Sequence, residues 1–86
     1  MPHRIRKRSV TIAGHATSVT VEDAFWQDLR RLARRRGLSL NALIGSVDAA
    51  RDGSLSSALR LLVLEGYRGG ELGPSRREDD GEAARR

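Results

Sequence analysis

Four cations lie close together near the start of the chain. Arg4, Arg6, Lys7 and Arg8 fall within five positions, and no acidic residue interrupts them. Arginine presents a planar fork of donors that matches phosphate oxygens, and clustered cations are typical of proteins that contact an anionic polymer. The alternative is a solvated tail, which the absence of acidic residues disfavours. The run therefore predicts a basic arm over residues 1–8 that contacts phosphate.

The overall charge agrees with this prediction. The chain of 86 residues has 16 Lys and Arg against 11 Asp and Glu, a net charge of +5 at pH 7, and residues 1–8 contribute four of these charges. A basic chain of this size suggests an anionic polymer as a partner more than an anionic membrane surface.

Groups typical of catalysis or metal binding are missing. The chain has no cysteine and two histidines, His3 and His15, and no carboxylates are paired in an apolar setting. No glycine-rich loop joins a strand to a helix. We therefore expect no enzyme activity, no metal site and no cofactor. No apolar run approaches the roughly 20 residues that span a bilayer, and the basic start lacks the apolar core of a secretory signal, so a cytoplasmic protein without membrane contact is expected.

Two short, similar words follow the basic run. Ser9-Val10-Thr11-Ile12 returns nine positions later as Ser18-Val19-Thr20-Val21. Both alternate a hydroxyl with a β-branched apolar residue, which is the pattern of a strand that buries one face. The first word is expected to fold back on the second across Ala13-Gly14-His15-Ala16.

Three amphipathic helices are predicted after the strands. The first covers residues 22–36 and ends at Gly37, a typical C-terminal stop. The second opens with Ser39 as N-cap and breaks at Asp52-Gly53, and the third covers residues 54–68 with Ser54 or Ser56 as its cap. From Gly69 the composition becomes polar and mixed in charge, so residues 69–86 are expected to form a disordered tail. The domain itself is expected to cover residues 9–68.

The central stretch carries a resemblance. "TSVTVEDAFWQDLRRLARRRGLSLNALI" resembles the ribbon-helix-helix fold of the Arc/MetJ type over residues 16 to about 50. The flanking words "RSVTIAGH" and "SSALRLLVLEGYR" further resemble a bacterial subgroup with an extra leading strand and a third helix.

The resemblance implies a mainly α fold with a short β-ribbon, formed as an intertwined homodimer whose intersubunit ribbon enters the DNA major groove. Carried over by position, the base-facing residues are Ala16, Ser18 and Thr20. The start of the second helix, at Ser39, Leu40 and Asn41, would anchor phosphate beside the basic arm. The implied dimer core consists of apolar residues from the ribbon and the first two helices: Val19, Val21, Phe25, Leu29, Leu32, Leu43, Ile44 and Val47.

The short ribbon residues leave alternatives open. Arg, Lys, Asn and Gln are the usual base-contacting side chains, whereas Ala16 offers one methyl group and Ser18 and Thr20 offer short hydroxyls. A small transcriptional regulator is the first hypothesis. A dimeric protein-interaction module that has lost base contacts is the second, and an antitoxin with a partner-binding tail is the third.

Overall fold

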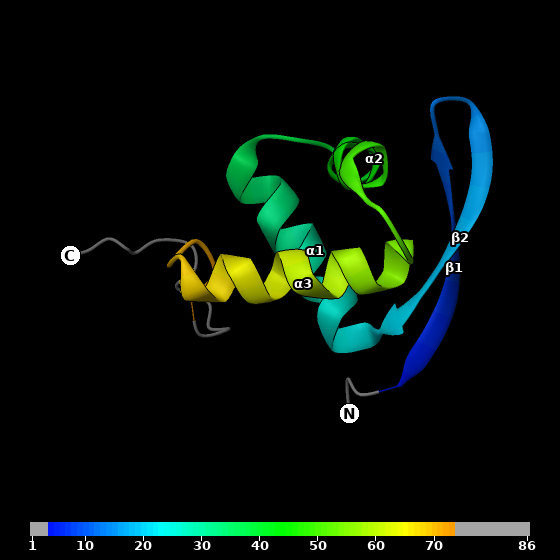
Figure 1. The fold of residues 1–86 in the computed structure, drawn as a ribbon. Coiled ribbons are helices and arrows are strands. Elements are labelled where there is room, and N and C mark those ends of the chain that lie inside the picture. Colours follow the sequence, from blue (N-terminus) through cyan, green and yellow to red (C-terminus); the bar gives the residue numbers. More distant parts are fainter. Residues whose placement is uncertain (1–3, 74–86) are drawn as a thin grey trace.

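A hairpin of two strands and three helices make up the fold (Figure 1). The computed structural model describes residues 4–73. The strands β1 (Ile5–Ile12) and β2 (His15–Glu22) are followed by the helices α1 (Asp23–Arg36), α2 (Leu40–Ala50) and α3 (Leu55–Arg68). The predicted short ribbon and three helices are therefore confirmed. The intertwined homodimer involves a second chain and stays a prediction.

The hairpin is longer than the two words predicted. The strands pair antiparallel from Ile12 opposite His15 to Ile5 opposite Glu22, and the amide of Asp23 donates to the carbonyl of Arg4 at 2.7 Å. The predicted arm boundary at residue 8 was thus wrong, because backbone pairing continues past the alternating apolar residues to the start of α1. Residues 5–8 form half of β1.

The turn is also tighter than expected. It consists of Ala13 and Gly14 alone, with φ of 51° and 84°. Positive φ at both central residues is characteristic of a type I′ turn, whose twist matches that of the flanking strands. His15 and Ala16, predicted within the turn, are the first residues of β2.

Ala13 is the poorer fit to this turn, because its side chain disfavours positive φ. Ala13→Asn supplies the residue that type I′ turns prefer at this position and is expected to raise the free energy of unfolding by about 1 kcal/mol. Urea denaturation followed by circular dichroism measures the change. Gly14→Ala is the matched variant and should lower the same quantity; an unchanged midpoint in Ala13→Asn would contradict the assignment of the turn.

The helix ends follow the sequence signals. Gly37 has φ 71°, and the amide of Leu38 donates to the carbonyl of Ala33 at 2.9 Å. A residue in the left-handed region followed by this hydrogen bond is a common C-cap of an α-helix. Ser39 Oγ accepts from the amide of Ala42 at 3.0 Å. Ser54 caps α3 by accepting from the amide of Ser57 at 3.1 Å, which resolves the choice between Ser54 and Ser56.

The core lies between the inner face of the hairpin and the three helices. Six of the predicted core residues are buried, and Phe25 and Val47 are only partly buried against them. Trp26 rather than Phe25 occupies the inward position at the start of α1, together with Leu29, Leu32 and Ala33. The predicted stripe was wrong at that position because α1 turns Trp26 under β1, where Arg8 covers its ring. The six buried residues are Val19, Val21, Leu29, Leu32, Leu43 and Ile44.

The segment after α3 is not a free tail. Leu72 is 2% exposed, its amide donates to the carbonyl of Gly66 at 2.9 Å, and a Cβ on Gly66 would lie 3.0 Å from Leu72 Cδ1. The predicted disorder was therefore wrong for residues 69–73, because one leucine in a polar stretch completes the core. The rest of the predicted tail, residues 74–86, lies outside the described residues.

Removing this leucine is expected to be costly. A chain that ends after Arg68 loses the buried Leu72 side chain and should be less stable by about 2–5 kcal/mol. A chain that ends after Gly73 keeps it and should melt within a few degrees of the full chain. Thermal melts of the two truncations test this, and equal melting temperatures would show that Leu72 does not contribute to the core.

The same segment carries an ion pair. The carboxylate of Glu71 accepts from Arg36 Nε and Nη2 at 2.7 and 2.9 Å, and these hydrogen bonds hold the pKa of Glu71 below its usual value. A lowered carboxyl pKa gives stability that is present above the unfolded-state pKa and is lost as the pH falls through the folded-state pKa. Glu71→Gln should therefore melt below the parent at pH 7, and the difference in melting temperature should shrink as the pH falls through the lowered pKa of Glu71. Because the pair is about a third exposed, the difference should stay under about 1 kcal/mol.

Candidate nucleic-acid interface

The outer face of the hairpin is polar and exposed. Directly opposite residues of an antiparallel pair share a face, and Ala16, Ser18 and Thr20 alternate with the buried Val19 and Val21. The three residues predicted to face bases therefore lie together on the exposed side. Their contact with DNA stays a prediction.

The register adds three residues to this face. Lys7 lies opposite Thr20, Ser9 opposite Ser18, and Thr11 opposite Ala16, and all three are exposed. The sequence placed Lys7 on an arm and gave Ser9 and Thr11 no role. The alternation of the first word, continued upstream to residue 5, is the signal that identifies them. The outer face thus carries a cation on β1 beside the hydroxyls of both strands.

The predicted cationic arm divides between two environments. Arg8 points toward the helices: its Nη2 contacts Asp23 Oδ1 at 2.7 Å and its guanidinium lies 4.6 Å from the centre of the Trp26 ring. Phosphate contact by Arg8 is therefore corrected to an internal ion pair, since Asp23 neutralises it and Trp26 covers it. Arg4, Arg6 and Lys7 remain exposed.

On the edge of β2 that faces away from β1, the backbone groups of Thr20 form hydrogen bonds with side chains of α3. Ser56 Oγ accepts from the amide of Thr20 at 3.1 Å, and Arg60 Nη2 donates to the Thr20 carbonyl at 3.5 Å. Arg60 Nε also donates to Glu22 Oε1 at 3.0 Å; backbone hydrogen bonding, and then this bond, keep the pKa of Glu22 below its usual value. In the alternating ladder the amides and carbonyls of Ala16 and Ser18 point to the same edge, and within residues 4–73 they have no hydrogen-bond partner.

The start of α2 has the geometry of an anion site. Ser39 and Asn41 are exposed and Leu40 is half-buried. Ser39 Oγ accepts a hydrogen bond from the amide of Ala42. The amides of Leu40 and Asn41 have no hydrogen-bond partner inside the described part of the chain. Exposed amides and the helix dipole favour a negative charge there. The helix lies beside β1 (Figure 1), where Gly45 approaches Ile12 closely enough for a Cβ to be 3.6 Å from its Cγ2.

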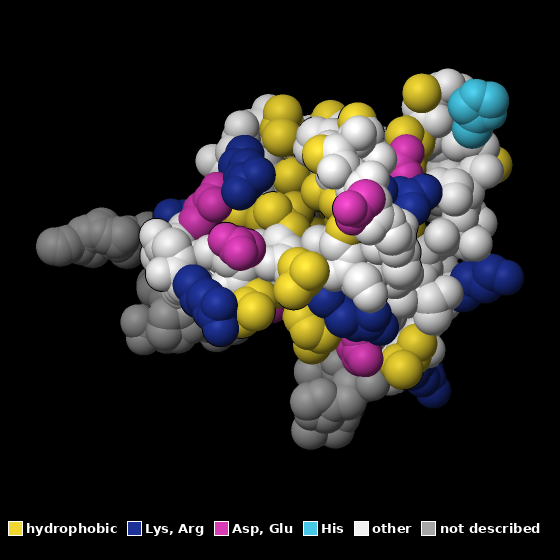
Figure 2. All heavy atoms as spheres, viewed as in Figure 1, with side chains coloured by type: hydrophobic (Ala, Val, Ile, Leu, Met, Phe, Trp, Pro, Cys, Tyr) yellow, Lys and Arg dark blue, Asp and Glu magenta, His cyan; other side chains and the backbone are white. Residues whose placement is uncertain are grey.

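A second group of cations lies on α1, and two of them, Arg30 and Arg34, line a hollow with Leu40 at the start of α2. Arg30, Arg34 and Arg35 are exposed and belong to the solvated side of α1. Arg31 is different, because its side chain is 11% exposed and contacts Asp28 at 3.0 Å. Figure 2 shows basic side chains scattered over the visible face of the molecule, so charge alone does not locate the interface.

Comparison with known proteins identifies the family. The model of the ribbon-helix-helix domain matches residues 5–67, most of the chain and nearly all of the described fold. This chain belongs to the ribbon-helix-helix family. The matched range starts at the first residue of β1, so the extra leading strand lies within the ribbon-helix-helix domain.

One solved structure is similar to this ribbon-helix-helix chain over most of its length. It is an uncharacterized protein from Bordetella pertussis Tohama I, which shares 26% identity with a TM-score of 0.65, over 86% of this chain and 66% of that one. This chain therefore spans a little under two thirds of the length of that protein. No curated protein matches.

Two other kinds of site receive no support from the described residues. Residues 4–73 contain no group of three or more His, Cys, Asp or Glu that would hold a metal ion. None of the helices in this range is long and apolar enough to cross a membrane.

Proposed function

We propose that this ribbon-helix-helix protein is a DNA-binding homodimer and a small cytoplasmic transcriptional regulator that lacks enzyme activity. The observation that carries the proposal is the outer face of the hairpin, where short hydroxyls of both strands lie beside the exposed Lys7. In this arrangement the ribbon enters the major groove, the cations hold the phosphates, and the hydroxyls meet base edges.

The distance between neighbouring strands suggests which strand faces the bases and which faces the phosphate backbone. In an intersubunit ribbon with the β2 strands at its centre, neighbouring strands lie about 4.8 Å apart, so each β2 is about 2.4 Å from the dimer axis and each β1 about 7.2 Å. The major groove is about 12 Å wide, which places β2 inside it and β1 at its walls. Ala16, Ser18 and Thr20 then face bases, whereas Lys7 faces the backbone.

The free backbone groups suggest a register for the intersubunit pairing. Because Ser56 and Arg60 occupy the amide and carbonyl of Thr20, the groups left on this edge are those of Ala16 and Ser18. Two antiparallel copies of β2 use these groups fully when Ala16 of one chain lies opposite Ser18 of the other. The two-fold axis then passes beside Thr17.

The N-terminus of α2 supplies the second phosphate contact. The unpaired amides of Leu40 and Asn41 would bind one phosphate oxygen from each half of the dimer. This contact fixes the position of the ribbon along the groove and is independent of the base sequence.

A salt titration of the full-length protein on random duplex DNA tests the proposal. Binding should weaken steeply with salt, since each neutralised phosphate adds about 0.9 to the slope of log affinity against log salt concentration. Selection from a random duplex library should then enrich a site with two-fold symmetry. Absence of salt-dependent binding at low ionic strength would reject the proposal.

A dimeric protein-interaction module is the second candidate. It is favoured by the short side chains of Ala16, Ser18 and Thr20, none of which makes a bidentate contact with a base. Salt-dependent binding without any enriched site would favour a non-specific DNA binder, whereas no binding together with a stable dimer would favour this module.

A further inference from the structure

The outer side of α3 is apolar, although the outward side of a surface helix is usually polar. Leu61, Leu64 and Tyr67 are 59%, 41% and 40% exposed. They account for three of the five exposed large hydrophobic residues within residues 4–73; the other two are Ile5 and Leu38. Their spacing of three residues places them along one stripe of the helix.

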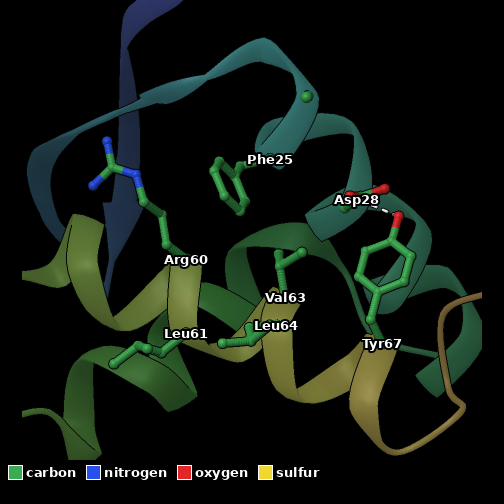
Figure 3. A pocket seen from close by; sticks show the side chains of 8 residues that line it. Phe25, Asp28, Arg60, Leu61, Val63, Leu64 and Tyr67 are labelled. Carbon is green, nitrogen blue, oxygen red and sulfur yellow. Dashed lines mark hydrogen bonds between the residues drawn. The ribbon is translucent and has the colours of Figure 1, made fainter. Parts of the chain in front are cut away.

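This stripe has a hollow on each side. A cavity of about 400 Å³ lies between α1 and α3, and Figure 3 shows Phe25, Val63 and Leu64 along it, with Arg60 at one end and Tyr67 at the other. Tyr67 Oη donates to Asp28 Oδ2 at 2.9 Å, which fixes the far wall. A second, more open hollow of about 600 Å³ lies between α2 and α3.

Leu61 lines both hollows. The second is formed largely by small and apolar side chains, among them Val47, Ala50, Ala58 and Leu62. In Figure 2 hydrophobic side chains gather along α3 and on both sides of it. One face therefore presents a projecting leucine and the depressions that another leucine would fill.

A second copy of this chain fits such a face. A two-fold interface brings the same patch of both subunits together, so each must offer both the projection and the recess. Ridges of one helix pack into the grooves beside another helix in this way.

Three cations around the face are neutralised within the chain, whereas the exposed Glu65 beside the second hollow forms no ion pair with another residue in the range 4–73. Arg60 is paired with Glu22, Arg36 with Glu71, and Arg51 with Asp48. The face also continues into the free edge of β2, because Ser56 and Arg60 of α3 are the residues that contact Thr20. One partner subunit is thus able to cover both surfaces.

We propose that the outer face of α3, centred on Leu61 and Leu64, is an interface with a second copy of this chain. The inference rests on the homodimer of the proposed function but not on its DNA contacts. It makes α3, which follows the two helices of the basic family outline, a determinant of assembly.

Sedimentation velocity over a concentration series tests this interface. Leu61→Glu and Leu64→Glu, tested separately, should each raise the dimer dissociation constant about tenfold or more, as expected for residues central to an interface. Leu38→Glu replaces a comparably exposed leucine on the α1–α2 loop and should leave the constant unchanged. Circular dichroism verifies that each variant is folded.

The outcomes separate this inference from the DNA proposal. Folded Leu61→Glu and Leu64→Glu variants that dimerise as tightly as the parent would overturn the α3 interface, and so would a monomeric parent. Selective weakening by these two variants supports it, even if neither they nor the parent binds DNA. In that case only the DNA proposal fails.

Discussion

Replacing Leu29 by aspartate is expected to leave the chain unfolded at 25 °C. Leu29 is fully buried, at 0% exposure, in the part of α1 that packs within the core. A buried carboxylate without a partner costs several kcal/mol, and a domain this small has only a narrow margin of stability. Far-ultraviolet circular dichroism should show loss of the helical signal, and Leu29→Ala should lose about 2–5 kcal/mol by urea denaturation.

The control is the same change at a solvated leucine. Leu38→Asp alters a side chain that is 42% exposed and should keep the helical spectrum of the parent. A folded Leu29→Asp protein would mean that α1 does not pack against the other elements as described.

Local signals in the sequence predicted the helices well. Gly37 and Ser39 are individually decisive, because a positive φ and a hydroxyl cap act within one turn of the chain. The β-branched alternation likewise predicted which side of β2 is buried. These features depend on residues close together in sequence.

The errors arose where distant residues decide the outcome. Leu72 lies in a polar segment, and its burial follows from the missing side chain of Gly66. Arg8 belongs to a basic run, but Asp23 neutralises it and the Trp26 ring covers its guanidinium, and both approach it only after the hairpin closes. The amino-acid composition of a short stretch of sequence does not reveal contacts with residues outside that stretch.

The residues of the candidate interface were likewise only partly predictable from the sequence. Placing Lys7 on the outer face requires the strand register, and the register requires a turn of two residues, Ala13 and Gly14. A shift of one residue would move every side chain of β1 to the opposite face. The four-residue turn expected from the sequence predicts a hairpin but does not determine which residues pair across it.

The location of DNA contact is best tested by two variants of equal charge. Arg4, Arg6 and Lys7 changed together to Gln remove three exposed cations from the start of the hairpin, and Arg30, Arg34 and Arg35 changed together to Gln remove three exposed cations from α1. Both lower the net charge of the chain equally, so any difference between them reflects position. Deleting residues 1–8 would be unsuitable because it removes half of β1.

We expect the hairpin variant to lose most of the salt dependence. A dimer presents six of these cations, and if half of them contact phosphate, the slope of log affinity against log salt concentration should fall by about three units. Affinity should drop alike on every sequence, because phosphate contacts do not distinguish bases. The α1 variant should lose less of the slope than the hairpin variant, because only Arg30 and Arg34 of its three residues lie near the proposed phosphate contact at Leu40.

Substitutions of the short ribbon residues complete the test. Ser18→Ala combined with Thr20→Ala should leave the slope unchanged and reduce only the preference between sites, since these hydroxyls face bases in the proposed arrangement. Fluorescence anisotropy of a labelled duplex at several salt concentrations measures all three proteins against the parent. An equal fall of slope in the hairpin and α1 variants would show that net charge rather than the ribbon holds the DNA. A larger fall in the α1 variant would place the main DNA contact on α1 and the start of α2 instead of the hairpin.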